Sequence, residues 1–308
     1  MSDWINVPTR LALYLSLMLT FGLPFFVLHA LRGQERFSSM ADRMGRLAAF
    51  TALAGIVLSI ASLIILSKAM TGAETYGEIG RHALGMVLTE TDFGASWLIR
   101  VVTLAGCFVV ALLLRNKAIL RFSVISIAAA VALSTLAWTG HGAMSEGIGR
   151  SIHLSADILH LLAGGAWVGS LAAFILLLRG AGESTREHID MLGRALNVFA
   201  LIGTVIVLGL IVTGTINYWM TVGATLDGLS STPYGLLLLV KLALFAMMLG
   251  LAAANRYRLS PLLERETRAG NYRVAIALLR KSLYAETSCA FLILISVSWL
   301  GMLAPMSN

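Results

Sequence analysis

The stretch Trp138–Trp167, WTGHGAMSEGIGRSIHLSADILHLLAGGAW, joins two long apolar segments of the chain. Its second half opens an apolar segment with His153, Asp157 and His160. Positions i, i+4 and i+7 of an α-helix fall within a narrow sector around the axis, so these three side chains share one face. A shared face of two imidazoles and a carboxylate, at the start of a membrane helix, predicts a metal site. The alternative is a polar helix start in which Asp157 lies near the helix N-terminus because of the helix dipole.

The first half of the same stretch is a glycine-rich loop that carries His141 and Met144. A loop with this many glycines can fold back over the helix that follows it. Imidazole and thioether groups are ligands for late transition metals, and thioethers favour Cu(I). We therefore expect His141 and Met144 to supply ligands to the same site from a second element.

The composition of the chain is that of a polytopic membrane protein. Of its 308 residues 58% are hydrophobic and only 13% are charged, with a mean hydropathy of +0.84, whereas soluble domains are about one quarter charged. The net charge of +7 follows from basic loops, so membrane topology explains it better than binding to nucleic acid. The two cysteines, Cys107 and Cys289, lie in apolar segments without CxxC spacing, and we expect buried thiols rather than a disulfide.

Eight segments are long and apolar enough to cross a bilayer, which takes about 20 residues. The sequence therefore predicts an all-α fold: one transmembrane domain, residues 1–308, built as a bundle of eight helices. No cleavable signal is expected, and the first segment is retained as a span. The predicted spans are residues 11–31, 47–67, 95–114, 119–139, 157–178, 195–219, 235–254 and 284–303.

The basic residues give the bundle an orientation. Seventeen Lys and Arg residues fall in the loops of one side and four on the other, and the basic side of a membrane protein faces the cytoplasm. This distribution predicts that both termini are periplasmic, in the inner membrane of a bacterium. Five tryptophans fall at the predicted periplasmic boundary, where indole rings are favoured: Trp4, Trp97, Trp138, Trp219 and Trp299.

Two cations lie within predicted spans, where a charged side chain needs a partner or a water-filled cavity. We expect Arg100 to point into the bundle and to pair with Asp157, which lies at a similar depth. Lys241 is expected to reach carbonyl groups, Asn217 or the outer cavity. The remaining accessory candidates for the metal site are His82, Met86 and Trp167.

Small residues in the spans predict close helix packing. Gly165 and Gly169 form a GxxxG pattern, and Gly209 and Gly214 reduce the width of the helix in the sixth span. Glycine lets helix backbones approach one another in lipid, so these positions are interpreted as packing sites rather than as functional ones.

Two runs carry a family resemblance: the pattern GHG…H…D..LHLLAGGAWVGSL, and TGTINYWMTVGATLDGLSSTPYGLLLLVKLALFAMMLGLAAANRYRL from Thr213 to Leu259. They resemble the CopD family of bacterial copper-resistance membrane proteins, over a core of about residues 138–303. The resemblance implies copper as the ion, often with a separate periplasmic copper-binding partner, CopC, and movement of copper towards the cytoplasm. Residues His141, His153, Asp157 and His160 match the polar pattern of that family.

We expect the primary copper ion, Cu(I) or Cu(II), at His141 and His160. Asp157 is then a ligand or an orienting group, and Met144 assists. His153 lies about 10 Å from His160 along the helix, so it would capture the ion nearer the water. The chain is not expected to be an enzyme. The alternatives are a b-type haem or copper-redox protein, and a membrane copper chaperone that does not transport.

Overall fold

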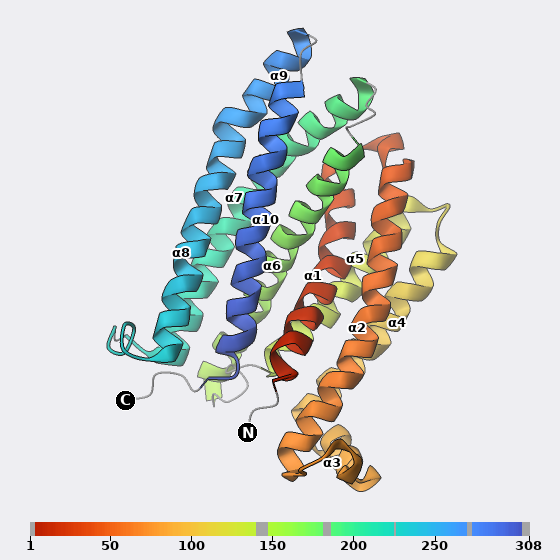
Figure 1. Ribbon diagram of the computed structural model, residues 1–308. Helices are drawn as coiled ribbons and strands as arrows, with labels where there is room; N and C mark the ends of the chain where they lie inside the picture. Colours follow the sequence, from red (N-terminus) through yellow and green to blue (C-terminus); the bar gives the residue numbers. More distant parts are fainter. Residues whose placement is uncertain (1–3, 140–146, 181–185, 225, 270–272, 304–308) are drawn as a thin grey trace.

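The computed structural model describes residues 4–139, 147–180, 186–224, 226–269 and 273–303. Over these ranges the chain is helical, without any strand. Within the same ranges eight helices are long and apolar enough to cross a membrane. The predicted all-α bundle of eight spans is therefore confirmed, and the chain is a multi-pass membrane protein (Figure 1).

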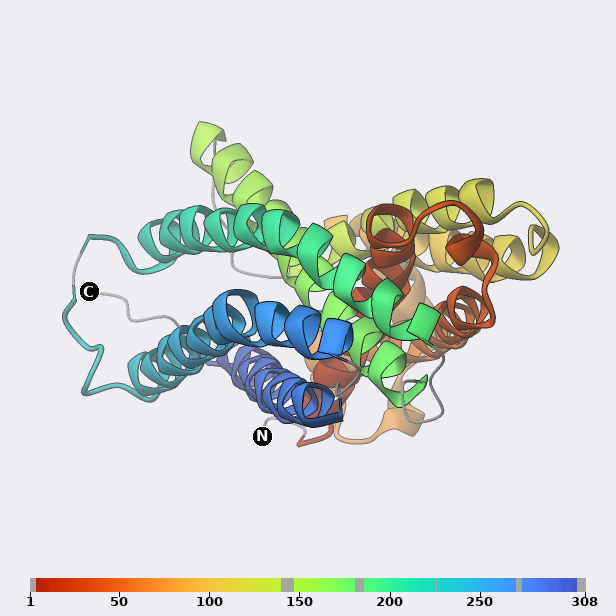
Figure 2. The same ribbon diagram turned by 90° about the horizontal axis from the view of Figure 1, so that it is seen from above.

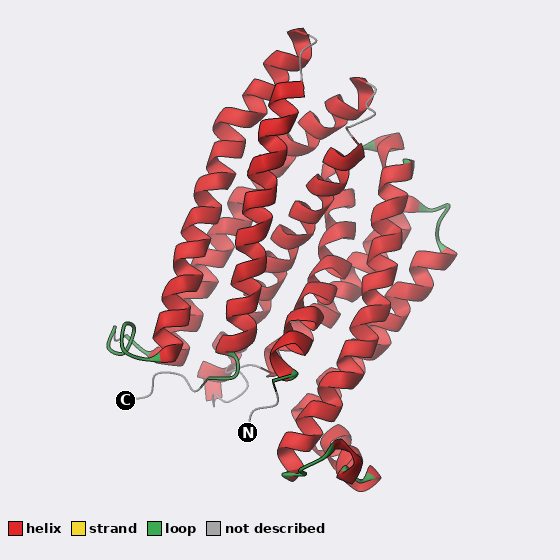
Figure 3. Ribbon diagram, in the orientation of Figure 1, coloured by secondary structure: helices red, strands yellow, loops and turns green. Residues whose placement is uncertain are grey.

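Short loops and short helices connect the spanning helices, as Figure 3 shows. The long helices are α1 (Asn6–Ala30), α2 (Ser39–Thr71), α4 (Asp92–Leu113), α5 (Ala118–Ser134), α6 (Gly147–Gly180), α7 (Arg186–Val222), α8 (Pro233–Ala254) and α10 (Arg273–Leu300). The short elements are the 3₁₀ helices η1 (Gly33–Phe37), η2 (Tyr76–Glu78) and η3 (Thr135–Thr139), the π-helix η6 (Asn255–Leu259), and the α-helices α3 (Arg81–Glu90) and α9 (Ser260–Ala269).

Several helices extend beyond the apolar runs of the sequence. Helix α6 begins at Gly147, ten residues before Asp157. Backbone hydrogen bonds continue a helix through polar residues, so an apolar run marks only the part that suits lipid. The helix dipole acts within the first turn, and Asp157 lies too far along α6 for the dipole to explain its position.

Helix α1 lies in the centre of the bundle, packed against α2, α5, α6 and α10. Helix α1 approaches α6 closely where Gly22 meets the predicted GxxxG pair. A Cβ atom on Gly22 would lie 2.3 Å from the carbonyl oxygen of Gly165 and 2.7 Å from the Cα of Gly169. The prediction of close packing at Gly165 and Gly169 is thus confirmed, and the partner is α1. For Gly209 the prediction is wrong, because a Cβ atom there would meet nothing within 4 Å.

The two ends of the described chain meet at one end of the bundle, which we call the termini end. The side-chain amide of Asn6 lies 3.0 Å from the sulfur of Met302, and Figure 1 shows α1 beginning where α10 ends. An even number of spans requires this arrangement. The basic loops between α1 and α2, α4 and α5, and α8 and α10 lie at the opposite end.

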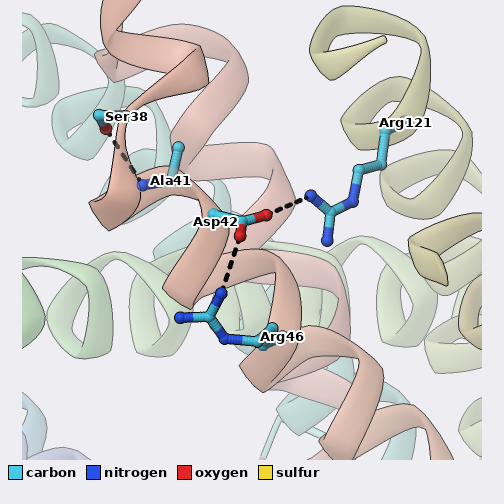
Figure 4. A network of polar contacts seen from close by, with 5 residues as sticks. All are labelled: Ser38, Ala41, Asp42, Arg46 and Arg121. Carbon is cyan, nitrogen blue, oxygen red and sulfur yellow. Dashed lines mark hydrogen bonds and ion pairs between the residues drawn. The ribbon is translucent and has the colours of Figure 1, made fainter. Parts of the chain in front are cut away.

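A network of polar contacts joins α2 to α5 at that opposite end (Figure 4). The hydroxyl of Ser38 accepts a hydrogen bond from the backbone of Ala41 and caps α2. One carboxylate oxygen of Asp42 lies 2.9 Å from the guanidinium of Arg121, and the other lies 2.7 Å from Arg46. Arg121 is almost fully buried, so this ion pair anchors α5 against α2.

Helices α7 and α8 pack on different neighbours and not along each other. Helix α7 packs along α6 and α8 packs along α10, and the two stand apart at the edge of the bundle in Figure 2. Side chains from both line one cavity. This cavity brings together the polar residues described next.

Candidate functional site

The cavity has a volume of about 620 Å³ and is bounded by α1, α6, α7, α8 and α10. Most of its wall is apolar. Polar side chains nevertheless converge on it from four helices: Arg10, Tyr14, His153, Asp157, His160, Asn217, Tyr218, Tyr234 and Lys241. An apolar cavity with a few convergent polar groups is the usual form of a ligand site.

His160 is held in one tautomer by Thr213 of α7. The Nδ1 atom of His160 lies 2.9 Å from the hydroxyl oxygen of Thr213, and that hydroxyl donates to the carbonyl of Gly209 at 2.6 Å. The single hydroxyl proton is thereby used, so Nδ1 of His160 must be the donor. The Nε2 atom then carries the free lone pair, which is the state of a histidine that binds a metal.

Asp157 is oriented by Asn217, one turn further along α7 from Thr213. The amide nitrogen of Asn217 donates to Oδ1 of Asp157 at 2.6 Å, while the amide oxygen of Asn217 is buried without a hydrogen-bond partner in the described structure. The second carboxylate oxygen, Oδ2, lies 4.0 Å from Nε2 of His153. Lys241 of α8 is near enough to Asp157 and His160 for its charge to act on both.

His153 is more buried than a residue near the membrane surface would suggest. It is 2% exposed, and its Nε2 atom lies 3.5 Å from the hydroxyl of Thr221. All three polar residues of the α6 face thus line one cavity, each beside a polar residue of α7. Among the described residues, no group of three or more His, Cys, Asp or Glu side chains converges closely enough to hold a metal ion. His141 and Met144 lie outside the described residues.

The accessory candidates fall into two groups. Trp167 and Lys241 line the cavity, and Trp167 is 3% exposed. His82 and Met86 lie on α3, which packs against α4 and α2, and neither is among the residues that line the cavity. Both side chains are exposed.

The predicted pair of Arg100 with Asp157 is wrong, although Arg100 does point into the bundle and is fully buried. Its guanidinium donates to the hydroxyl of Thr135 at 2.7 Å and to the backbone carbonyl of Thr135 at 3.3 Å. The last turn of the fourth span forms the 3₁₀ helix η3, which places these two acceptors beside Arg100. Asp157 faces the cavity instead.

Sequence reasoning missed Thr213, which orients His160, and it named Asn217 only as one possible partner of Lys241, not as the partner of Asp157. Lys241 does line the cavity, which was another of the alternatives given for it. A threonine in an apolar helix usually donates to its own backbone, as Thr213 also does. A hydroxyl that donates to its own backbone does not by itself reveal that it also accepts a second hydrogen bond. The spacing of Thr213, Asn217 and Thr221 at four-residue intervals was the available signal, because it gives α7 one polar face.

The chain is similar to known proteins over its whole length. The family model "Copper resistance protein D-like, N-terminal domain" matches residues 1–152, and "Copper resistance protein D" matches residues 193–300. A copper resistance protein D of Pseudomonas syringae pv. tomato is 43% identical over 305 residues, which cover 99% of this chain and 98% of that protein. No solved structure matches the chain.

Two further relatives are more distant. The inner membrane protein YebZ of Escherichia coli strain K12 is 27% identical over 305 residues, which cover 98% of each chain. The copper transport protein CutJ of Bacillus subtilis strain 168 is 29% identical over 259 residues, which cover 80% of this chain and 45% of that protein.

Proposed function

The chain belongs to the copper resistance protein D family, and from this membership we propose that it binds copper in the cavity and moves it across the bacterial inner membrane. The cavity lies towards the termini end, which the distribution of basic residues assigns to the periplasm. Copper then enters from the periplasm and leaves towards the cytoplasm. Copper is the cargo, and no catalysed reaction is proposed.

The observation that carries this proposal is the bond between His160 and Thr213. It leaves Nε2 of His160 unprotonated in a cavity that is also lined by the carboxylate of Asp157. Imidazole nitrogen is a ligand for both Cu(I) and Cu(II). A second group that fixes the tautomer of the ligand is the usual companion of a metal-binding histidine.

We propose His160 as the principal ligand, with His141 and Met144 completing the coordination and Asp157 as a ligand or an orienting group. His153 captures the ion first. A separate periplasmic protein of the CopC kind would deliver it. Only neutral imidazole coordinates a metal, and the hydrogen bond from Nδ1 of His160 to Thr213 leaves its Nε2 lone pair available.

The direct test is the affinity of the purified full chain for Cu(I) in detergent at neutral pH, measured without oxygen against a competing chelator. His160→Ala should lose more than about 100-fold in affinity, since even a supporting group beside a ligand changes affinity by about 10- to 100-fold. His82→Ala is the matched control, because His82 is exposed on α3, outside the cavity. Unchanged binding in His160→Ala would falsify the site.

Two measurements separate this function from its alternatives. Vesicles that contain the chain should accumulate copper from outside when the termini face outward, whereas a chaperone would bind copper without moving it. A Soret band in the purified protein would favour the haem alternative. Reporter fusions after Asn308 should be active in the periplasm, and a cytoplasmic signal there would reverse the proposed direction.

A further inference from the structure

A second buried polar cluster lies beyond the cavity, where α8 meets α10. Asn255 begins the π-helix η6 at the end of α8, and its side-chain nitrogen donates to Oε2 of Glu286 at 2.8 Å. Glu286 is 2% exposed and Asn255 is 7% exposed. A carboxylate buried this deeply in a spanning helix is costly unless a cation accompanies it.

No lysine or arginine within the described ranges forms an ion pair with Glu286. Arg256 is adjacent in sequence to Asn255, but its guanidinium bonds to the carbonyl of Ala200 and the hydroxyl of Thr204 on α7. Glu286 therefore presents a carboxylate without a protein cation. Intramembrane carboxylates of this kind are rare and often mark ion pathways.

Two residues next to this carboxylate carry further donor atoms. The amide oxygen of Asn255 is buried and has no hydrogen-bond partner in the described structure. Cys289 lies three residues after Glu286 on the same face of α10, is 4% exposed, and is close enough for the charge of Glu286 to act on its thiol. The cluster thus offers carboxylate oxygen, amide oxygen and sulfur.

The π-helix accounts for the position of Asn255. Five residues, Asn255–Leu259, form this wider turn between α8 and α9, and the hydroxyl of Ser260 donates to the carbonyl of Asn255 at 2.9 Å. A π-turn is rare and is frequently found at functional sites. In this chain the π-turn begins at Asn255, whose side-chain amide donates to Glu286.

Trp167 lies between the cavity and this cluster. Its ring lines the cavity, and its indole N–H is near Glu286 without making a hydrogen bond of normal geometry to any described residue. An ion that left the cavity along α6 would pass Trp167 and reach Glu286 next.

We propose that Glu286, Asn255 and Cys289 form a second copper site, which receives Cu(I) from the cavity. The proposal rests on the proposed function, because it places this site on the path of the transported ion. Thiolate sulfur selects Cu(I). As the Cu–S bond forms, the thiol proton of Cys289 passes to the carboxylate of Glu286, so the thiolate alone balances the single charge of Cu(I).

The test loads the full chain in detergent with Cu(I) in the absence of oxygen, then measures copper stoichiometry and X-ray absorption. The wild type should bind two ions. Glu286→Gln and Cys289→Ser should each bind one, and Cys289→Ser should also lose a sulfur neighbour of copper. Cys107→Ser is the matched control, because Cys107 is equally buried but its thiol donates to the carbonyl of Ile125.

Further variants separate the second site from the first and from effects on folding. Asn255→Asp keeps an oxygen donor and should retain two ions, whereas Asn255→Leu should bind one. His160→Ala should lose the other ion and keep the sulfur contributed by Cys289. If Cys289→Ser keeps both ions, or if Cys107→Ser has the same effect as Cys289→Ser, the second site is wrong while the first stands. If only the Glu286 and Cys289 variants lose copper, the site at His160 is wrong instead.

Discussion

The two faces of α6 differ in how closely their neighbours approach. On one face Gly169 lies so near Gly22 of α1 that a Cβ atom would be 2.3 Å from the Cα of Gly22. On the other face His153, Asp157 and His160 border a cavity of about 620 Å³. Helix α6 therefore has one face with no space for a methyl group and another face with space for a ligand.

This difference separates a closely packed contact from an open surface on the same helix. The contact with α1 fixes the position and rotation of α6, and so fixes where its polar face points. The polar partners of that face come from α7, and Lys241 comes from α8, while α7 and α8 pack on different neighbours. Relative movement of α7 and α8 would change the cavity without disturbing the contact between α1 and α6.

The largest expected effect is at the tight face. Gly169→Leu should prevent α6 from packing on α1, because the atoms in the way are backbone atoms of Gly22 that cannot move aside. We expect loss of the folded protein, measured as aggregation in size-exclusion chromatography and failure to accumulate in the membrane. A folded Gly169→Leu protein with a normal melting temperature would show that α1 and α6 do not need this contact.

The next effect concerns the open face and should leave the fold intact. Thr213→Val removes the acceptor for the Nδ1 proton of His160, while valine has nearly the shape of threonine. Copper affinity should fall by about 10- to 100-fold, as for other groups that orient a metal ligand. Thr103→Val is the control, because Thr103 does not line the cavity and donates to backbone carbonyls of its own helix, those of Ile99 and Arg100. Equal affinities of Thr213→Val and the wild type would remove the argument for the tautomer of His160.

The two faces also differ in how far the sequence predicts them. The number of spans and the close packing at Gly165 and Gly169 follow from local patterns, because length, hydropathy and GxxxG spacing each act within one helix. The shared face of His153, Asp157 and His160 follows from helical periodicity in the same way. What lies opposite each face depends on tertiary packing. The partner Gly22, the bond from Thr213 to His160 and the contact of Arg100 with Thr135 were therefore not predicted.

Depth in the membrane was a useful but incomplete guide to pairing. Arg100 and Asp157 were matched because they lie at similar depths, yet residues at one depth can face different neighbours around the bundle. The 3₁₀ turn at η3 supplied acceptors that hydropathy does not reveal. Asn255 was missed for a related reason, since a π-turn has no recognisable pattern in one sequence.

A smaller effect is expected where the tight neighbour is a flexible side chain. A Cβ atom on Gly45 of α2 would lie 2.6 Å from a guanidinium nitrogen of Arg121, which pairs with Asp42. Gly45→Ala should displace that guanidinium, at a net cost of about 1 kcal/mol once the better helix propensity of alanine is included. Chemical unfolding in detergent measures this cost. The cost should nearly vanish in an Asp42→Asn background, and a full cost there would show that the ion pair is not involved.

The smallest effect, of opposite sign, is expected at Gly209 of α7. A Cβ atom there would meet nothing within 4 Å, so alanine adds no collision. Alanine also limits the unfolded backbone and favours the helix, which should stabilise α7 by up to about 1 kcal/mol. The carbonyl of residue 209 remains in place to accept the hydroxyl of Thr213, so copper affinity should not change. Chemical unfolding and copper titration of Gly209→Ala measure these two effects. Comparison with Gly169→Leu tests whether the effect of replacing a glycine depends on the space around it. Destabilisation by Gly209→Ala would mean that α7 packs at this position against a neighbour other than the described residues.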